Sequence, residues 1–526
     1  MLVAGGQVLW SASDLTAATG CEYAVLRRLD IKLGWVESTD EAPDPLAERI
    51  ADLGNRHEAV ELDRLRAEFG AYDPATGGGA AEIDRPRPYT PDVLRQRQAD
   101  TFAALRAGAD VVYQGAFFDG RFHGFADFLV RDGGAYRVCD AKLARNEQPK
   151  ALLQLAAYAD QLDRAGIPLD ADAELLLGSG RRVRYPLAEI APVFGERRAR
   201  LVDLLDRHRA GEQPLTWGAP QIMACGRCEV CAAEVEAHRD LLLVAGMRAT
   251  QRRRLRDAGV TTIDQLATHD GPVDQLAAGT LARLRAQAAL QVRQTHDSDG
   301  RPHVLVDVFA PDQLRTIPPP SVGDLFFDFE GDPLWTDGNA DDWGLEYLFG
   351  VTEPPTTPGG SGHFRAFWAH DRPAEKRALE DFFGYVRERR AAHSDMHIYH
   401  YAAYEKAALT RLAIRHATCE DEVDDLLRAG VLVDLYAVVC STIRVSQPSY
   451  SIKQFEPLYM GDDPRSGRSP TRPPRSWSTT PSARRGRPAA RGWPTGCWSR
   501  SATTTSTTAT ARSRCATGCW PEPAGT

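Results

Sequence analysis

The chain has 526 residues, of which 43% are hydrophobic, and its formal net charge is −9, so it can form two to four domains with buried cores. The sequence does not open with a basic segment followed by an apolar stretch, and it lacks any run of about 18 apolar residues, which argues against a signal peptide and a membrane span. Its ten cysteines do not follow the pattern of a secreted disulfide framework, so we expect a soluble, cytoplasmic protein.

Residues 1–240 alternate helical patterns with short apolar strands, which is typical of an α/β domain. The stretch "GFADFLVRDGGAYRVCDAK" predicts two strands joined by a two-glycine turn, with Asp127 on the first strand and Asp140 and Lys142 at the end of the second. Residues two apart in a strand point to the same side, so Asp140 and Lys142 face one spot. Two carboxylates suit a hard divalent cation. A lysine beside them can orient or help deprotonate an attacking water and offset the charge of a phosphate.

Two helical stretches flank this hairpin. "LGNRHEAVELDRL" predicts a helix that carries His57, a candidate for a further metal ligand, and "QLAAY" places Gln154 and Tyr158 four residues apart on one helix face. Taken alone, the two aspartates could be strand-end or turn residues and Lys142 a solvated side chain. The occurrence of all these residues in this order is stronger evidence for a catalytic metal site than any one of them alone.

The order of these motifs resembles the RecB-type branch of the PD-(D/E)xK nuclease superfamily, which includes the CRISPR-associated iron–sulfur exonucleases. That branch has a helical His motif, a G-x-x-D strand, a (D/E)-x-K strand and a Q-x-x-x-Y helix. These motifs correspond here to His57, to "GFAD" ending at Asp127, to Asp140 and Lys142, and to Gln154 and Tyr158 in "QLAAY". The resemblance implies Mg²⁺- or Mn²⁺-dependent cleavage of phosphodiester bonds in DNA, with Gln154 and Tyr158 supporting the site or the substrate backbone.

Three cysteines lie close together in "MACGRCEVC", at Cys225, Cys228 and Cys231, and Cys21 is the obvious distant fourth ligand. Two C-x₂-C steps place three thiolates around one tight loop, as a zinc or iron–sulfur site needs. Several RecB-type nucleases join one N-terminal cysteine to a C-terminal cysteine group through a [4Fe–4S] cluster, and the resemblance implies the same here. The spacing in this chain is more compact than in those relatives, which leaves Zn²⁺ as the alternative.

Residues 241–300 are expected to be a small, wholly helical domain. "LVAGMRATQRRRLRDAGVTTIDQLATHDG" resembles a helix-hairpin-helix segment, whose backbone N–H groups bind phosphates without reading bases. Local positive charge comes from Arg252, Arg253, Arg254 and Arg256. A plain helical linker with a solvated arginine face is the alternative interpretation.

A second α/β pattern runs over residues 301–467. "DLFFDFEGDPLW" places Asp328 and Glu330 on the same face of a strand, "HIYHYAAYEKAALTRL" brings Glu405 on a helix, and "GVLVDLYAVV" brings Asp434. This order, followed by "YSIKQFEPLY", resembles the DEDD-type exonucleases of the RNase H fold, with Glu405 where Asp is usual. The resemblance implies four carboxylates that bind two metal ions, but the last acid of that motif set is missing from the written sequence.

Residues 468–526 differ from the rest of the chain. They hold ten Arg, one Glu and no Lys or Asp, a balance of +9 that leaves −18 (−9 − 9) for residues 1–467, and they lack Leu, Ile, Val, Phe and Tyr. Such a segment cannot build a core and is expected to be disordered. Many DNA sequences could encode the tail. If such a sequence is read in the frame that begins one nucleotide earlier, starting at Ala502, one choice of third codon bases gives "DYNEYDCDSTLALRDWLLARA", which contains the missing motif. We therefore interpret the tail as out-of-frame translation after a frameshift, and the RNase H-like domain as truncated.

The whole arrangement resembles bacterial RecB-like nucleases that usually continue into a superfamily 1 helicase. No G-x-x-x-x-G-K-[ST] loop is present in this sequence, so we predict no ATPase activity. The function we expect is a metal-dependent, exonucleolytic deoxyribonuclease of DNA repair or processing that acts on single-stranded DNA or free ends, with a helicase as a partner. The alternative is a non-catalytic nucleic-acid-binding scaffold, or an inactive fragment of a longer nuclease-helicase.

Overall fold

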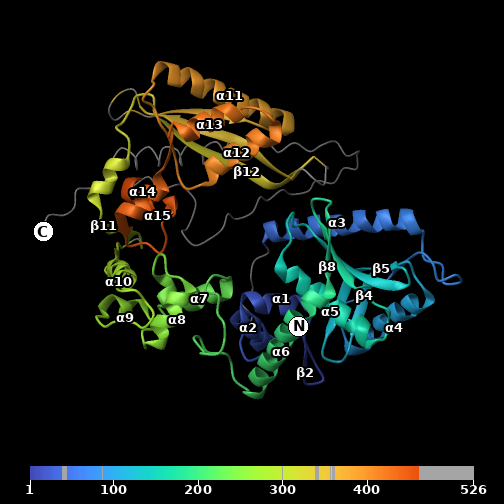
Figure 1. Ribbon diagram of the computed structural model, residues 1–526. Helices are drawn as coiled ribbons and strands as arrows, with labels where there is room; N and C mark the ends of the chain where they lie inside the picture. Colours follow the sequence, from blue (N-terminus) through green and yellow to red (C-terminus); the bar gives the residue numbers. More distant parts are fainter. Residues whose placement is uncertain are drawn as a thin grey trace. The chain divides into compact units, whose positions relative to one another are not determined.

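The computed structural model describes residues 1–37, 44–85, 87–298, 300–337, 343–355, 357, 360 and 362–460. The chain divides into two compact units, residues 1–238 and 239–526, each with its own β-sheet (Figure 1). Both units combine helices with strands, which confirms the expected α/β class. The four-part division expected from the sequence stays a prediction, and the tail, with its proposed frameshift, lies outside the described residues.

The first unit is built on a six-stranded sheet with the strand order β3-β4-β5-β6-β7-β8. Its strands are β3 (Ala80–Glu82), β4 (Val111–Phe118), β5 (His123–Asp132), β6 (Ala135–Lys142), β7 (Asp172–Leu177) and β8 (Arg182–Pro186), preceded by a separate hairpin of β1 (Leu2–Ala4) and β2 (Gln7–Leu9). The pairs β3–β4 and β6–β7 are parallel and the other three are antiparallel.

The turn between β5 and β6 fixes the register of the two central strands. Gly133 and Gly134 have φ angles of 54° and 92°, and a two-residue turn of this kind needs residues that tolerate positive φ. The ladder that starts at this turn continues without a shift along both strands. Its register places Asp127 opposite Asp140.

Helices cover both faces of this sheet. They are α1 (Ala12–Gly20), α2 (Glu22–Leu33), α3 (Pro45–Phe69), α4 (Pro91–Ala107), α5 (Pro149–Arg164), α6 (Leu187–Ala210) and α7 (Glu229–Ala237). Helix α5 contributes to the largest buried cluster, which also includes residues of α1, α4 and α6. Helix α3 packs on the other face through Leu62 and Leu65, which contact Phe128, Cys139 and other residues of the sheet. The sheet ends that carry Asp127 and Asp140 therefore lie between these two helices.

The second unit begins with the expected helical segment. It consists of the 3₁₀ helix η1 (Leu241–Leu243) and the helices α8 (Ala249–Asp257), α9 (Ile263–Thr268) and α10 (Ala278–Val292), which share one hydrophobic core. The segment is joined to the rest of the unit through Gln287. The side-chain N–H of Gln287 donates to the Val445 carbonyl at 2.8 Å, and the Tyr450 hydroxyl donates to Gln287 Oε1 at 3.1 Å.

The remaining part of the second unit holds a five-stranded sheet with the order β14-β13-β12-β15-β16. Its strands are β12 (Leu325–Thr336), β13 (Trp343–Glu353), β14 (His363–Trp368), β15 (Ile398–His400) and β16 (Leu432–Asp434). Four short strands stand apart from it, namely β9 (Thr295–His296) paired with β10 (Pro302–His303), and β11 (Val306–Val308) paired with β17 (Ile443–Val445). Strands β12, β15 and β16 run parallel, so their carboxyl ends meet at one edge of the sheet.

Helices pack on both faces of this second sheet. They are α11 (Arg372–Ala392), α12 (Tyr404–His416), α13 (Glu420–Arg428), α14 (Leu435–Thr442) and α15 (Ile452–Tyr459), and the short 3₁₀ helix η2 (Pro311–Thr316) contacts α14. Phe327 and Phe329 of β12 point into one core, with α11, α12 and α13, while Phe326 points into a second core with α14 and α15. This alternation leaves Asp328 and Glu330 on the same face as Phe326.

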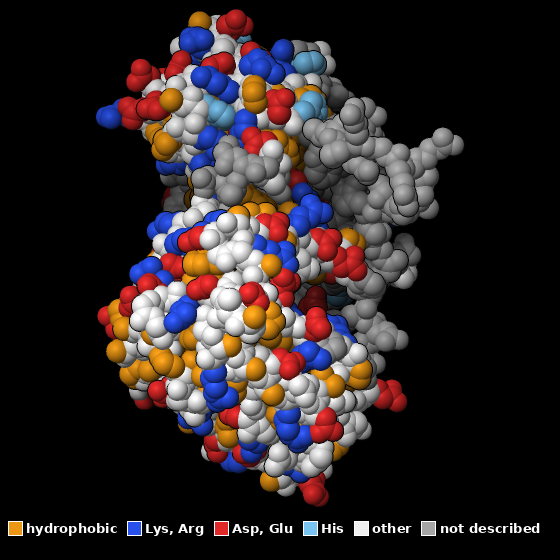
Figure 2. Space-filling view, turned by 90° about the vertical axis from the view of Figure 1, so that its right-hand side faces the viewer, with side chains coloured by type: hydrophobic (Ala, Val, Ile, Leu, Met, Phe, Trp, Pro, Cys, Tyr) orange, Lys and Arg blue, Asp and Glu red, His pale blue; other side chains and the backbone are white. Residues whose placement is uncertain are grey.

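The described helices include none that is long and apolar enough to cross a membrane. On the face shown in Figure 2, basic and acidic side chains are interspersed and do not gather into one large area of a single sign.

Candidate functional site

Asp127 and Asp140 lie at the end of the β5–β6 hairpin that is remote from its turn. The hydrogen-bonded ladder stops one step before them, and the Ala141 backbone N–H donates to Asp127 Oδ2 at 2.9 Å. Asp140 is only 4% exposed. Burial, and secondly the charge of Asp127, raise the pKa of Asp140 well above its usual range. The two carboxylates therefore share a desolvated corner in which a positive charge would be strongly favoured.

Lys142 supplies positive charge at this corner. Its Nζ lies 2.6 Å from Asp140 Oδ2, as the two-residue period of a strand requires. Burial alone would lower the pKa of Lys142, but the charges of Asp140 and Asp127 outweigh it and raise the pKa. The side chain is therefore an ammonium group near neutral pH, with 31% of its surface still exposed.

A third carboxylate, Glu58, comes from helix α3. Burial, followed by the charge of Asp127, raises its pKa to about 7. Its Oε2 accepts a hydrogen bond from Gln114 Nε2 at 3.0 Å and lies 3.4 Å from the Tyr113 hydroxyl. Its other carboxylate oxygen, Oε1, makes no hydrogen bond with the part of the chain that the structure describes. Glu58 thus faces the aspartates with one oxygen held and the other available.

The structure places His57 differently from the sequence interpretation. Its Nε2 lies 3.1 Å from the backbone carbonyl oxygen of Leu176, so in this structure the ring is engaged with strand β7, and the adjacent Glu58 is the α3 side chain that interacts with Asp127. The pattern "NRHEAVEL" could not distinguish the two residues, because they are neighbours and the rotation of α3 about its axis is set by packing. A metal-binding role for His57 stays a prediction.

Tyr158 lies beneath the carboxylates on helix α5. It is 8% exposed, and burial together with the charges of Asp127 and Asp140 raises the pKa of its phenol. Its ring packs against Phe117 and Phe122. A Cβ atom on Gly124 would lie 2.8 Å from Tyr158 Cε1, which explains why "GFAD" begins with glycine. Tyr158 is therefore a buried support of the strand that carries Asp127.

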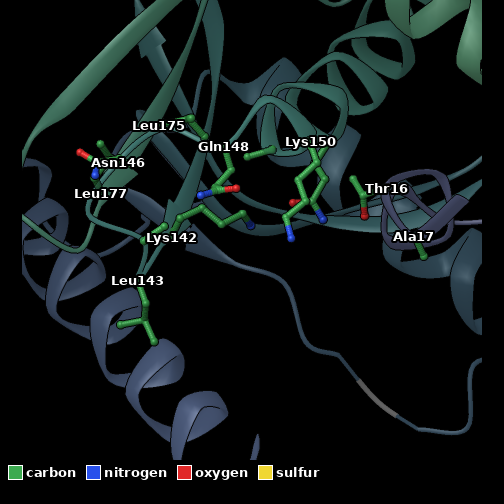
Figure 3. A pocket seen from close by; sticks show the side chains of 12 residues that line it. Thr16, Ala17, Lys142, Leu143, Asn146, Gln148, Lys150, Leu175 and Leu177 are labelled. Carbon is green, nitrogen blue, oxygen red and sulfur yellow. The ribbon is translucent and has the colours of Figure 1, made fainter. Parts of the chain in front are cut away.

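Gln154 lies one helical turn before Tyr158 and lines an open pocket of about 530 Å³ beside Lys142 (Figure 3). Amides and hydroxyl groups dominate its polar lining, and Lys150 adds a second basic group. The polar lining residues are Thr16, Lys142, Asn146, Gln148, Lys150 and Gln154. Leu175 and Leu177 of β7 add apolar surface, so the pocket offers hydrogen-bond donors, positive charge and an apolar wall next to the lysine.

The four predicted cysteine ligands converge in the first unit. The Sγ atoms of Cys21, Cys225, Cys228 and Cys231 all lie within 4.8 Å of one another. Cys21 and Cys231 are the closest pair, with 3.4 Å between their sulfur atoms. Burial opposes ionisation of Cys225, but backbone N–H groups of Arg227 and Cys228 outweigh it and lower its pKa to about 7. The cluster joins the start of α2 to the loop before α7 and so connects the two ends of the unit.

The arginines of the helical segment have different environments. Arg252 forms a two-pronged ion pair with Asp240, with N–O distances of 2.7 and 2.5 Å, and only 12% of its side chain is exposed. Arg254 donates to the Gln275 carbonyl at 2.6 Å. Arg253 is exposed and Arg256 is half-buried. The ion pair gives Arg252 a structural role that the sequence did not indicate. Of the four arginines, only Arg253 has a largely exposed side chain.

The acidic residues of the second sheet differ from one another in their surroundings. Asp434 Oδ1 accepts hydrogen bonds from the backbone N–H groups of Ala402 and Tyr436, both at 2.9 Å, and so caps helix α14. Glu405 is 2% exposed, and its Oε2 lies 3.7 Å from His400 Nδ1. Asp328 and Glu330 are half-buried on β12. Their predicted roles as metal ligands stay predictions.

Comparison with known families identifies both α/β regions. Residues 10–233 match the model of the PD-(D/E)XK nuclease superfamily, and residues 325–477 match the model of the RNase H superfamily. The search of curated proteins found no match. The chain therefore contains a PD-(D/E)XK nuclease superfamily domain and an RNase H superfamily domain, which confirms these two parts of the sequence interpretation. The RecB-type assignment within the first superfamily stays a prediction.

Proposed function

We propose that this chain is a metal-dependent nuclease that hydrolyses phosphodiester bonds of DNA at the site formed by Glu58, Asp127, Asp140 and Lys142. The single observation that supports this proposal most strongly is the convergence of three carboxylates on one lysine, inside the part of the chain that matches a nuclease superfamily. Functional sites often bring acids and bases together in this way because they need shifted pKa values.

The donor set fits a hard divalent cation. Carboxylate oxygens are the ligands that Mg²⁺ and Mn²⁺ prefer, and burial together with the charge of Asp127 disfavours the ionised forms of Asp140 and Glu58 in the absence of a cation. Asp127 and Asp140 would hold the ion, with Glu58 as a further ligand or outer partner. Mg²⁺ or Mn²⁺, when bound, supplies Lewis acidity at the phosphate and favours the loss of a proton from water.

Lys142 and Glu58 have complementary roles in this proposal. The charges of Asp140 and Asp127 raise the pKa of Lys142 and keep the metal-free site's lysine protonated near neutral pH. It donates hydrogen bonds to a phosphate oxygen and offsets the negative charge that develops there. Glu58, with a pKa of about 7 and a free Oε1, is suited to accept the proton of the attacking water.

The pocket beside Lys142 can bind the part of the substrate next to the phosphate that is cleaved. Gln154, Gln148 and Lys150 can donate hydrogen bonds to a sugar–phosphate backbone, and the apolar wall can contact a base or sugar. An open pocket of this kind suits a single strand or a free end, in agreement with exonucleolytic cleavage. A role in DNA repair and cooperation with a helicase rest on the resemblance to RecB-like nucleases.

We further propose that the cysteine cluster holds one Zn²⁺ ion. Tetrahedral zinc with Zn–S bonds of about 2.3 Å places its sulfur ligands roughly 3.8 Å apart, and the observed separations of up to 4.8 Å, with a closest pair at 3.4 Å, fit this spacing. A [4Fe–4S] cube carries each thiolate on a different iron atom and so separates the sulfurs further. The geometry thus favours the alternative cofactor over the cluster that the resemblance implied.

The proposal is tested with the full chain, purified without chelator, on end-labelled single-stranded DNA with Mn²⁺. We expect degradation that EDTA abolishes and that Lys142→Ala lowers by about 10²–10³-fold, the usual cost of one charge-stabilising donor. RNA and double-stranded DNA of the same sequence define the substrate preference. A folded protein that binds DNA and cleaves none of the three substrates would contradict the proposal and favour the binding scaffold.

A further inference from the structure

Gln114 combines two unfavourable features at one buried position of strand β4. It is 4% exposed, and its φ angle of 56° lies in the left-handed region that side chains other than glycine rarely adopt. Its Oε1 is buried and has no hydrogen-bond partner among the described residues. Glycine at this position would avoid the backbone strain, and an apolar residue would avoid the buried oxygen without a hydrogen bond. Packing alone therefore does not account for a glutamine.

The position of Gln114 links it to the carboxylates. In the β4–β5 ladder, the pairs Tyr113–Phe128 and Gly115–Ala126 are formed, and the step between them holds Gln114 opposite Asp127 without a regular pair. The unusual backbone angle thus falls beside the residue that starts the acidic cluster. Strained backbone that the surrounding fold tolerates is often found at functional sites.

The side-chain amide of Gln114 holds one carboxylate of this cluster. Its Nε2 donates to Glu58 Oε2 at 3.0 Å. The carboxylate that receives this bond belongs to a helix and the amide to a strand, so the contact ties α3 to the sheet at the site itself. A carboxylate with one oxygen fixed in this way presents the other oxygen, Oε1, in a defined direction.

We propose that Gln114 is a positioning residue of the metal site, which orients Glu58 through Nε2 and offers its unpartnered Oε1 to the water that accompanies the cation. This inference rests on the proposed function, because it needs a cation at Asp127 and Asp140. It accounts for both unfavourable features, since the strained backbone aims the amide and the unpaired oxygen gains a partner when the site is loaded. Partners of metal ligands that act in this way typically contribute about 10–100-fold to metal affinity.

Two variants separate positioning from a structural role. Gln114→Gly keeps the positive φ without strain but removes the amide, and Gln114→Glu keeps the size of the side chain but replaces the donor with an acceptor that repels Glu58. Gln275→Gly is the matched control, because Gln275 is an exposed glutamine with nearly the same φ, 57°, outside the first unit. The readouts are the unfolding temperature in EDTA and the Mn²⁺ dissociation constant of the full chain, measured by the electron paramagnetic resonance of free Mn²⁺.

Binding to the proposed site is defined as the Mn²⁺ binding that Asp140→Asn removes. We expect both Gln114 variants to weaken this binding by about 10–100-fold, and Gln275→Gly to leave it unchanged. In EDTA, the unfolding temperature of Gln114→Gly should be close to that of the unvaried protein, because the relief of backbone strain offsets the lost side-chain contacts.

The outcomes distinguish this inference from the proposal on which it rests. If the unvaried protein shows no Asp140-dependent Mn²⁺ binding, the proposed metal site is wrong and the inference fails with it. If that binding is present and both Gln114 variants retain it at full strength, only the role of Gln114 is overturned. If Gln114→Gly does not fold, Gln114→Glu gives the decisive affinity.

Discussion

The two carboxylate groups of this chain differ in what occupies their oxygens. In the first unit, Glu58, Asp127 and Asp140 converge on Lys142 next to an open pocket, and burial, followed by the charge of Asp127, raises the pKa values of Glu58 and Asp140. In the second unit, Asp434 caps a helix and Glu405 lies buried beside His400. The first group has an ammonium group 2.6 Å from one of its aspartates, whereas the metal-binding roles of Asp328, Glu330 and Glu405 in the second group stay predictions.

The largest effect that we expect concerns the cysteine cluster, which the first unit has and the described part of the second unit lacks. Structural zinc sites bind with about 10–16 kcal/mol in small domains. Removal of the ion should therefore unfold the first unit at a much lower temperature and leave the second transition in place. Calorimetry before and after a strong chelator measures this change. Metal analysis should find about one zinc atom per chain and no stoichiometric iron.

The next largest effect should appear in the second unit. Arg252→Ala removes the guanidinium group that pairs with Asp240, whose side chain is 3% exposed, and loss of one member of a buried ion pair typically costs about 3–5 kcal/mol. We expect this loss in the unfolding free energy of the second unit. The neighbouring variant Arg253→Ala, which removes an exposed side chain, is the control and should change stability by less than about 0.5 kcal/mol. Equal effects of the two variants would contradict the structural role of Arg252.

A smaller effect should follow from Glu58→Gln. We expect Mn²⁺ affinity to fall by about 10–100-fold, whereas Glu405→Gln in the second unit should leave it unchanged. The pH dependence has a defined sign. Burial and Asp127 raise the pKa of Glu58 to about 7, so the metal-free protein loses stability as pH rises from the usual range of a carboxyl to about 7.

Because the ion needs the ionised carboxylate, the gain in unfolding temperature that Mn²⁺ produces should increase over the same pH range. Glu58→Gln should flatten the part of this profile near pH 7, while the raised pKa of Asp140 keeps some dependence in place. Thermal scans with and without Mn²⁺ across this range measure the profile. A profile that is the same in both proteins would remove Glu58 from the site.

The smallest effect should be that of Arg253→Ala on DNA binding. Its side chain is exposed, and a phosphate contact of this kind contributes about one unit to the slope of log affinity against log salt. We expect a weak loss of affinity that is the same for all DNA sequences. Fluorescence anisotropy at several salt concentrations measures this slope, and an unchanged slope would favour the plain helical linker.

Local rules explain which parts of the first site could be predicted from the sequence. The two-glycine turn sets the hairpin register, and the period of a strand then brings Asp127, Asp140 and Lys142 together. Glu58 was not predicted, because the rotation of α3 depends on how Leu62 and Leu65 pack on the sheet. Gln114 gave no signal either, since a positive φ at a residue other than glycine is imposed by the surrounding fold.

The same limit applies to the second unit and to the cysteines. The strands that carry Asp328, Glu330 and Asp434 follow from apolar runs, but the burial of Glu405 depends on the packing of α12 against the sheet. The C-x₂-C spacing predicted a metal site, and the choice between an ion and a cluster needed the distances between sulfur atoms.

The most direct test of the account compares Asp140→Asn with Asp328→Asn in the full chain, with Mn²⁺-dependent cleavage of end-labelled single-stranded DNA as the readout. Each variant replaces one carboxylate by a neutral side chain of nearly the same size, in one unit only. The account predicts that Asp140→Asn lowers cleavage by about 10²–10³-fold and that Asp328→Asn leaves it within about twofold. Loss of cleavage in Asp328→Asn with full activity in Asp140→Asn would contradict it and place the working site in the second unit.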